Sequence, residues 1–123
     1  MIQRGSMLTV ADNSGAFTVK CIQILGGSFK KSASVGDLIL VAVQNLRLIR
    51  KIKKGQICLA IIVRTKQGIK DKDGSITSFS NNSVVLLNSS KKIIGNRLFG
   101  PFSKQLRKRK MLRLLIMTGY NIL

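Results

Sequence analysis

The sequence contains no histidine, no glutamate and no tryptophan, and its acidic residues are four aspartates. These are Asp12, Asp37, Asp71 and Asp73. Each lies in a turn-forming sequence, where an Asp side chain caps the local backbone without any catalytic role. General acid–base chemistry therefore has few candidate groups, and scattered aspartates do not form a metal cluster. Since Gly26-Gly27 is not part of a GxxxxGK[ST] loop, we expect a protein that is not an enzyme and has no cofactor, metal or small-molecule substrate.

Cysteines and long apolar segments are also scarce. Cys21 and Cys58 form no CxxC motif, and without histidine they cannot complete a zinc site. We expect both to be buried, reduced thiols, and the sequence alone leaves a disulfide between them open. The longest apolar runs, 38–43 and 57–63, are far shorter than the roughly 20 residues of a membrane-spanning helix. The N-terminus lacks the apolar region of a secretory signal, so we expect no membrane partner.

Positive charge is the property that the sequence has in excess. The chain has 22 Lys and Arg residues and a net charge of +18 over 123 residues, yet 45% of its residues are hydrophobic. A disordered basic tail would lack that apolar content. The combination predicts a folded core with a cationic surface, which repels itself unless a polyanion neutralises it. Nucleic acid is the polyanion that such a surface suggests first.

Turn signals occur often along the chain and separate short runs rich in Val and Ile. The expected strands are 7–10, 17–25, 38–43, 57–63 and 84–87. The polar stretch 69–77, with Asp73-Gly74 at its tip, predicts an exposed β-hairpin. This rhythm of short strands predicts a mainly β fold, a small barrel or a sandwich.

In the expected strand 17–25, the alternation of apolar and polar residues changes part of the way along the strand. Phe17, Val19 and Cys21 are expected to share the face that points to the core. The alternation of apolar and polar residues then slips at Ile22, which is apolar as well. A slip of this kind predicts a β-bulge, which bends a strand as a closed barrel requires.

The basic residues fall into patches with almost no acid between them. Solvated surfaces normally mix the two signs, so the patches together predict contact with nucleic acid. The residues expected to bind RNA are Lys30, Lys31, Arg47, Arg50, Lys51, Lys53, Lys54, Arg64, Lys66, Lys70 and Lys72. A helix start is predicted at Pro101-Phe102-Ser103, with Ser103 as the N-cap. It is followed by the densest patch, which consists of Lys104, Arg107, Lys108, Arg109, Lys110 and Arg113.

Aromatic residues are few, and they limit the mode of binding. Proteins that bind single strands present exposed aromatic side chains between basic ones, and Phe29 is the only residue whose sequence context fits. We therefore expect contacts to the phosphates and shape of structured RNA. A free-standing OB-like or architectural nucleic-acid-binding protein is the alternative. A membrane-active cationic protein fits less well, because a basic amphipathic helix of useful length is missing.

The chain also contains a multi-part sequence pattern with fixed gaps. It runs from Val10-Ala11-Asp12-Asn13-Ser14-Gly15-Ala16 through Ala60-Ile61-Ile62-Val63, Asp73-Gly74 and Val85-Leu86 to Gly95-Asn96-Arg97-Leu98-Phe99-Gly100-Pro101. With this pattern the chain resembles the universal ribosomal protein L14 (uL14) family, in its bacterial and organellar form, essentially from end to end. The resemblance implies a small closed five-stranded β-barrel with a projecting β-hairpin ribbon and a short C-terminal helical segment, about 103–123, within a single domain spanning 1–123.

The resemblance also implies a function and partners. Family members are structural constituents of the large ribosomal subunit, bind its rRNA directly and lie at the subunit interface, where they form intersubunit bridges. The implied partners are large-subunit rRNA, small-subunit rRNA across the interface, neighbouring proteins resembling uL3 and bL19, and a ribosome-silencing factor. The residues implied for the interface and for factor docking are Asn96, Arg97, Lys104, Arg107, Lys108, Arg109 and Lys110.

Two further features concern departures from the family and the compartment. Phe17-Thr18 stands where many relatives have a basic pair, so we expect one RNA contact of the family to be lost here. Phe29 likewise replaces a His or Arg of the family. The excess of Ile, Lys, Asn and Ser indicates an A+T-rich genome, and no transit peptide is recognisable. We expect an organelle-encoded protein of the mitochondrial matrix, in the mitoribosome, with the plastid stroma or a bacterial cytoplasm as alternatives.

Overall fold

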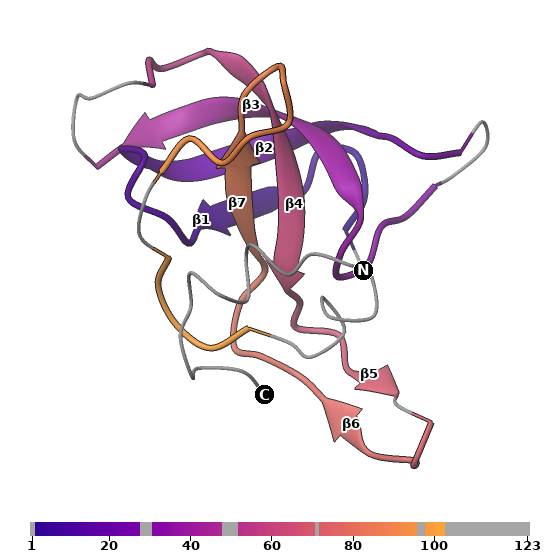
Figure 1. Ribbon diagram of the computed structural model, residues 1–123. Helices are drawn as coiled ribbons and strands as arrows, with labels where there is room; N and C mark the ends of the chain where they lie inside the picture. The colour runs from indigo at the N-terminus through magenta and orange to yellow at the C-terminus, as the bar shows by residue number, and fades with distance from the viewer. Residues whose placement is uncertain (1, 28–30, 48–51, 71, 96–97, 103–123) are drawn as a thin grey trace.

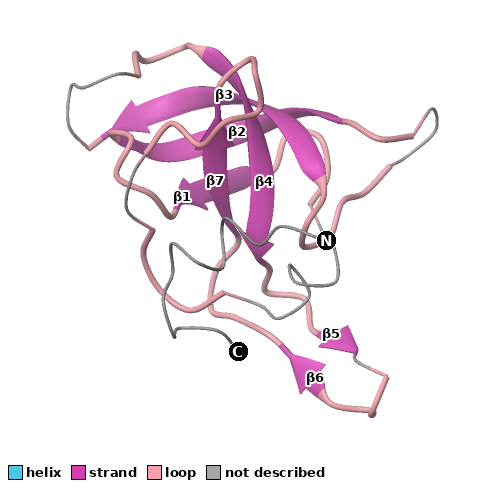
Figure 2. Ribbon diagram, in the orientation of Figure 1, coloured by secondary structure: helices cyan, strands magenta, loops and turns pink. Residues whose placement is uncertain are grey.

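The computed structural model describes residues 2–27, 31–47, 52–70, 72–95 and 98–102. The strands are β1 (Met7–Val10), β2 (Ala16–Ile24), β3 (Leu38–Leu46), β4 (Ile57–Arg64), β5 (Ile69–Lys70), β6 (Ile76–Thr77) and β7 (Ser83–Leu87). Five of them close a barrel in the order β1-β2-β3-β4-β7, as Figures 1 and 2 show. The described residues include no helix that is long and apolar enough to cross a membrane. The expected mainly β fold with a closed five-stranded barrel is confirmed.

The β5–β6 hairpin projects from one end of the barrel (Figure 1). It forms a separate two-stranded sheet in which Ile69 pairs with Thr77 and Lys70 with Ile76. At its tip, Oδ1 of Asp73 accepts hydrogen bonds from the backbone N–H and the hydroxyl of Ser75, at 3.0 and 2.7 Å. The predicted exposed hairpin is therefore confirmed. The predicted C-terminal helical segment, 103–123, lies outside the described residues.

Bulges in β2 determine which of its side chains face the core. The pairing of β2 with β3 shifts register between Cys21 and Gln23, where the sequence predicts a bulge. Two more shifts surround Thr18. Because each bulge moves the alternation of faces by one residue, Ala16 is buried and Phe17 is 42% exposed. The expectation that Phe17 faces the core with Val19 was wrong for this reason.

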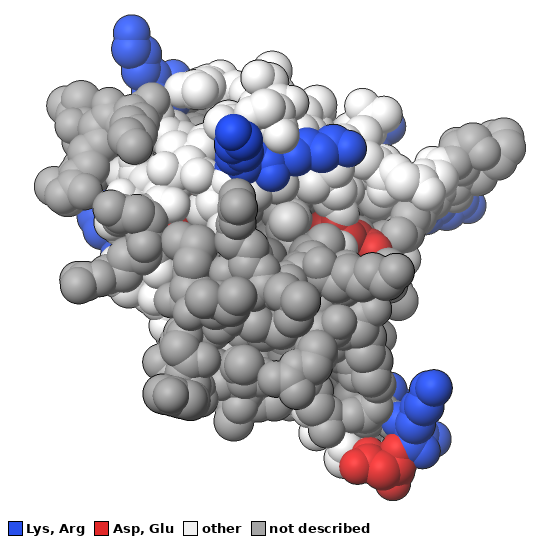
Figure 3. Space-filling view, in the orientation of Figure 1, with Lys and Arg blue, Asp and Glu red and all other residues white. Residues whose placement is uncertain are grey.

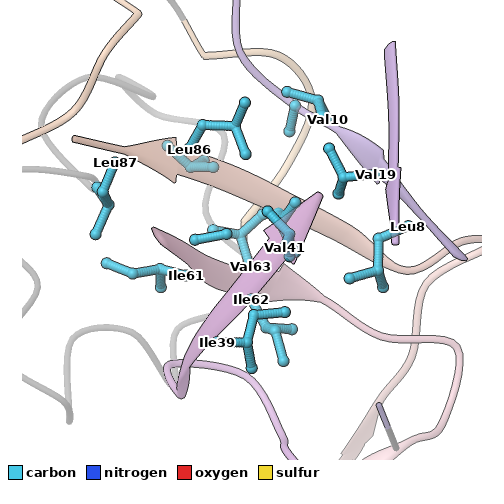
Figure 4. Packing of buried hydrophobic residues seen from close by; sticks show 14 of the residues in the cluster. Leu8, Val10, Val19, Ile39, Val41, Ile61, Ile62, Val63, Leu86 and Leu87 are labelled. Carbon is cyan, nitrogen blue, oxygen red and sulfur yellow. The ribbon is translucent and has the colours of Figure 1, made fainter. Parts of the chain in front are cut away.

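The core consists mainly of Val, Ile and Leu side chains from all five barrel strands. Val10, Val19, Val41 and Leu86 gather between the strands in Figure 4, and each is at most 5% exposed. Burying branched side chains of this size from several strands provides the main stabilisation of such a barrel. The runs 38–43 in β3 and 57–63 in β4 are apolar throughout, which predicts that both faces of these strands are covered, but the structure differs in part. The outer residues of β3 are half-buried or exposed, and Ile57 at the start of β4 is 59% exposed.

The two cysteines are free and buried, as expected. Val41 pairs with Cys21 on one side and with Cys58 on the other, so two strand spacings separate the cysteines. That corresponds to about 9–10 Å between their Cα atoms. A disulfide needs a Cα separation below about 7 Å, so the structure excludes a bond between them.

The barrel is closed by a parallel seam between β1 and β7. Thr9 pairs with Ser83 and Val10 with Val84, and the backbone N–H of Ala11 donates to the Val84 carbonyl at 2.9 Å. The Asn82 carbonyl accepts from both the backbone N–H and the hydroxyl of Thr9, at 3.1 and 3.0 Å. These bonds satisfy backbone N–H and C=O groups at the edges of β1 and β7, which would otherwise be free to pair with other chains.

Asp12 adds a side-chain bond to this seam. Its Oδ1 accepts from the backbone N–H and hydroxyl of Ser14, at 3.1 and 2.6 Å, which is the turn cap that the sequence predicts. Its Oδ2 accepts from the backbone N–H of Leu86 in β7, at 3.1 Å. The carboxylate is buried, and this burial raises the pKa of Asp12 above its usual range. A turn residue thus also holds the last strand of the barrel.

The contribution of the Asp12–Leu86 bond can be measured with a matched pair of variants. Asp12→Ala and Asp73→Ala each remove one acid and the same pair of bonds to a serine two residues on. Only Asp12→Ala leaves buried donors without an acceptor, namely the Leu86 N–H and the two groups of the buried Ser14, whereas the exposed Ser75 can bond to water; each buried donor costs about 1–3 kcal/mol. Urea unfolding should therefore show Asp12→Ala to be less stable than Asp73→Ala by at least that amount. Equal unfolding free energies would mean that the bond to β7 contributes nothing.

Candidate nucleic-acid interface

Exposed positive charge surrounds the described part of the barrel on several sides. The exposed basic residues are Arg4, Lys20, Lys31, Arg47, Lys53, Lys54, Lys66, Lys70, Lys72, Lys91 and Lys92. Of the three described aspartates, Asp12 and Asp37 are buried and only Asp73 is exposed. Figure 3 shows blue side chains at separate places on one face, with acid at the tip of the ribbon and also on the barrel. The described surface thus contains almost no charge that could neutralise its cations.

The expected RNA-binding residues lie mostly in the connections between strands. Lys31 precedes β3, Arg47 follows it, and Lys53-Lys54 form the turn before β4. That turn is held to β3, because the backbone N–H of Gly55 donates to the Val43 carbonyl at 2.8 Å. The structure therefore distributes these cations around the ends of the barrel.

The ribbon brings together the remaining described cations of the predicted set. Lys70 lies in β5, Lys72 in the turn at the tip, and Lys66 at the root of the ribbon. The backbone N–H of Lys66 donates to Oδ1 of Asn82 at 2.8 Å, which fixes the root against the start of β7. The ribbon thus presents a row of exposed lysines on a support that is anchored to the barrel.

Several predicted residues cannot be placed. Lys30, Arg50, Lys51, Asn96, Arg97, Lys104, Arg107, Lys108, Arg109 and Lys110 lie outside the described residues, as does Phe29.

Arg64 differs from the exposed cation that the sequence suggests. It follows a register shift at the end of β4 and is half-buried, with its Nε shielded from solvent and without a hydrogen-bond partner among the described residues. Its guanidinium packs against Gly100, where an added Cβ would overlap Nη1 and lie 3.1 Å from Cζ. Burial lowers the pKa of Arg64, because it disfavours the charged form. The structure thus holds a cation partly out of water, and no described residue provides an acceptor for its Nε.

Sequence reasoning missed an exposed aromatic residue. Phe17 is 42% exposed, and the guanidinium carbon of Arg47 lies 4.9 Å from the centroid of its ring. Phe99 is 38% exposed as well. The signal in the sequence was the pair Phe17-Thr18 in place of the basic pair of relatives, but the bulges that turn Phe17 outward depend on pairing with β3.

These features define a class of small, closed β-barrels with a strongly basic surface, a lysine-bearing ribbon and few exposed acids. A protein-family model described as Ribosomal protein L14p/L23e matches residues 1–121. The chain belongs to the ribosomal protein L14p/L23e family, and the resemblance found in its motifs is confirmed. Membership makes the chain a structural constituent of the large ribosomal subunit, in a family that is structural rather than enzymatic.

The packing of Arg64 on Gly100 can be tested with Gly55 as the control. Both glycines have positive φ, +80° and +83°, but a Cβ at Gly55 would meet nothing within 4 Å. Gly55→Ala should cost about 1–2 kcal/mol for the left-handed backbone alone. Gly100→Ala should cost about 1–3 kcal/mol more, because the methyl group displaces a half-buried guanidinium.

The excess cost of Gly100→Ala should disappear when Arg64 is changed to Ala in the same chain. Chemical denaturation of the two single variants and the double variant gives this coupling directly. If Gly100→Ala still cost more stability than Gly55→Ala in the Arg64→Ala background, the excess cost would come from contacts other than that with the arginine.

Proposed function

We propose that the chain binds large-subunit rRNA directly through the exposed lysines and arginines of its strand connections and ribbon. The observation that supports this most strongly is the imbalance of charge on the described surface, where Asp73 is the only exposed acid. An rRNA fold neutralises such a surface from several sides and releases condensed counterions as it binds. Phosphate contacts of this kind fix position and orientation without reading sequence.

Two kinds of phosphate contact follow from the geometry. Lys66, Lys70 and Lys72 are exposed on the ribbon and suit the phosphates of an RNA groove. Arg64 is held in place at the ribbon root by its packing on Gly100, so its guanidinium loses little freedom when it pairs with an anion. We assign Lys31, Arg47, Lys53 and Lys54 to further backbone contacts around the barrel.

The subunit interface is assigned to the segment beyond Gly95. We propose that Asn96, Arg97, Lys104, Arg107, Lys108, Arg109 and Lys110 face small-subunit rRNA, neighbours resembling uL3 and bL19, and a ribosome-silencing factor. The support is the family membership together with the density of positive charge in this segment. We also propose that residues 1–123 form one domain, with 103–123 as its helical extension.

For the compartment, we propose the mitochondrial matrix, with the plastid stroma and the bacterial cytoplasm as alternatives. The support is compositional: the chain is rich in Ile, Lys, Asn and Ser and contains no Glu.

Sedimentation tests the proposed binding against a free-standing nucleic-acid binder. A tagged copy of the chain, expressed in its own cells, should sediment with large subunits and stay there in moderate salt, because many phosphate contacts act together. A variant with Lys66, Lys70 and Lys72 changed to Gln should leave the subunits at lower salt than wild type. Recovery of wild type only in the free pool, together with a shift of generic DNA, would support the alternative instead.

The interface assignment has its own test. Changing Lys108, Arg109 and Lys110 to Gln should weaken association of the two subunits or docking of a factor, while unfolding free energy changes by less than about 1 kcal/mol. Ile62→Ala, in the buried core, should instead cost about 2–5 kcal/mol. Light scattering of subunit association is the readout, and Lys91→Gln with Lys92→Gln is the charge control. A loss of stability as large as that of Ile62→Ala would refute the assignment.

A further inference from the structure

One aromatic side chain on the barrel surface is stacked under a cation. Phe17 lies in β2 and is 42% exposed, although a ring of this size is normally buried in a chain with only five Phe and one Tyr. Arg47, also exposed, directly follows β3, and its guanidinium carbon lies 4.9 Å from the ring centroid. One face of the ring is therefore covered by the guanidinium of an exposed arginine.

The backbone holds this pair in position. The N–H of Arg47 donates to the Gly15 carbonyl at 2.8 Å, next to the pairing of Ala16 with Leu46. The bulges around Thr18 then turn Phe17 outward and place it below Arg47. Because Phe17 lies in β2 and the backbone of Arg47 is bonded to Gly15 just before β2, the stack is formed before any ligand arrives, which lowers the entropy that binding would cost.

Polar groups lie beside the stack. Thr18 pairs with Asn45, whose Nδ2 donates to the Thr18 hydroxyl at 2.9 Å and so fixes the plane of the amide. Asn45 is exposed, and its Oδ1 accepts no hydrogen bond from the described residues. Lys20 is the second residue after Thr18 in β2, so the Cα atoms of these two residues are about 7 Å apart. Lys20 is exposed on the same side of the strand as Thr18.

From this geometry we infer that the Phe17–Arg47 pair is a stacking site for an unpaired RNA base. The inference rests on the proposed binding of rRNA and adds to it a contact with a base. The base stacks on the outer face of the Arg47 guanidinium, which the Phe17 ring supports from below. The Asn45 amide bonds to the edge of the base, and Lys20 binds the adjoining phosphate. A site for phosphate alone would need Arg47 but not an exposed ring beneath it.

The test uses the full chain and two RNA decamers. One is a single-stranded decamer in which 2-aminopurine, whose fluorescence falls when it stacks, is the only base, and the other is abasic at all ten positions with the same number of phosphates. Wild type should bind the first more tightly, by about fivefold to a hundredfold, and should quench its fluorescence. Phe17→Leu and Arg47→Lys should abolish the preference and the quenching. Phe17→Leu should keep the affinity of wild type for the abasic decamer, because its charge is unchanged.

Lys92→Gln is the matched control, since it removes an exposed charge of the turn after β7 that is not part of the stack. It should weaken binding of both decamers by the same factor and leave the preference intact. If Phe17→Leu retained the preference, or if wild type bound both decamers equally, the stacking site would be refuted. Sedimentation of wild type with large subunits would still support rRNA binding in that case, so the failure of one proposal is distinguishable from the failure of the other.

Discussion

The parallel seam between β1 and β7 is the constraint on which the rest of the barrel depends. Only two residue pairs, Thr9 with Ser83 and Val10 with Val84, form its register. Bonds from outside the ladder strengthen it, namely those of Ala11 to Val84 and of the Asp12 carboxylate to Leu86. Without this seam the sheet would have two open edges, and the inward face of β7 would lose its cover.

The seam also sets the position of the ribbon. Asn82, directly before β7, accepts from Thr9 through its carbonyl and from Lys66 through its side chain. The root of the ribbon is therefore fixed by the same residue that ends the seam. Arg64, the last residue of β4, lies next to this root and packs on Gly100. The positive charge of the ribbon is thus presented at a defined angle to the barrel.

The sequence was sufficient to predict the strands and the hairpin because these depend on local patterns. Even the bulge after Cys21 was visible as a slip in the alternation of apolar residues. The outward turn of Phe17 was not visible, because it depends on how β2 pairs with a strand more than twenty residues away.

The candidate site was predictable to a smaller extent. That Lys31, Lys53, Lys66 and Lys70 are exposed follows from composition, since lysine is almost never fully buried. The half-burial of Arg64 and its packing on Gly100 could not be predicted from composition, because they arise from contacts between segments distant in the sequence. The double role of Asp12 was missed for the same reason: the turn cap is local, but the bond to Leu86 spans 74 residues.

The charge of +18 makes the free barrel repel itself, and we propose that rRNA is the polyanion that neutralises it. Acetylation of lysines, read by mass spectrometry in the free chain and in purified large subunits, tests this claim most directly. The account predicts that Lys31, Lys53, Lys54, Lys66, Lys70 and Lys72 react in the free chain, are protected in the subunit, and react again after ribonuclease digestion. Equal reactivity of these lysines in the free and assembled states would contradict it.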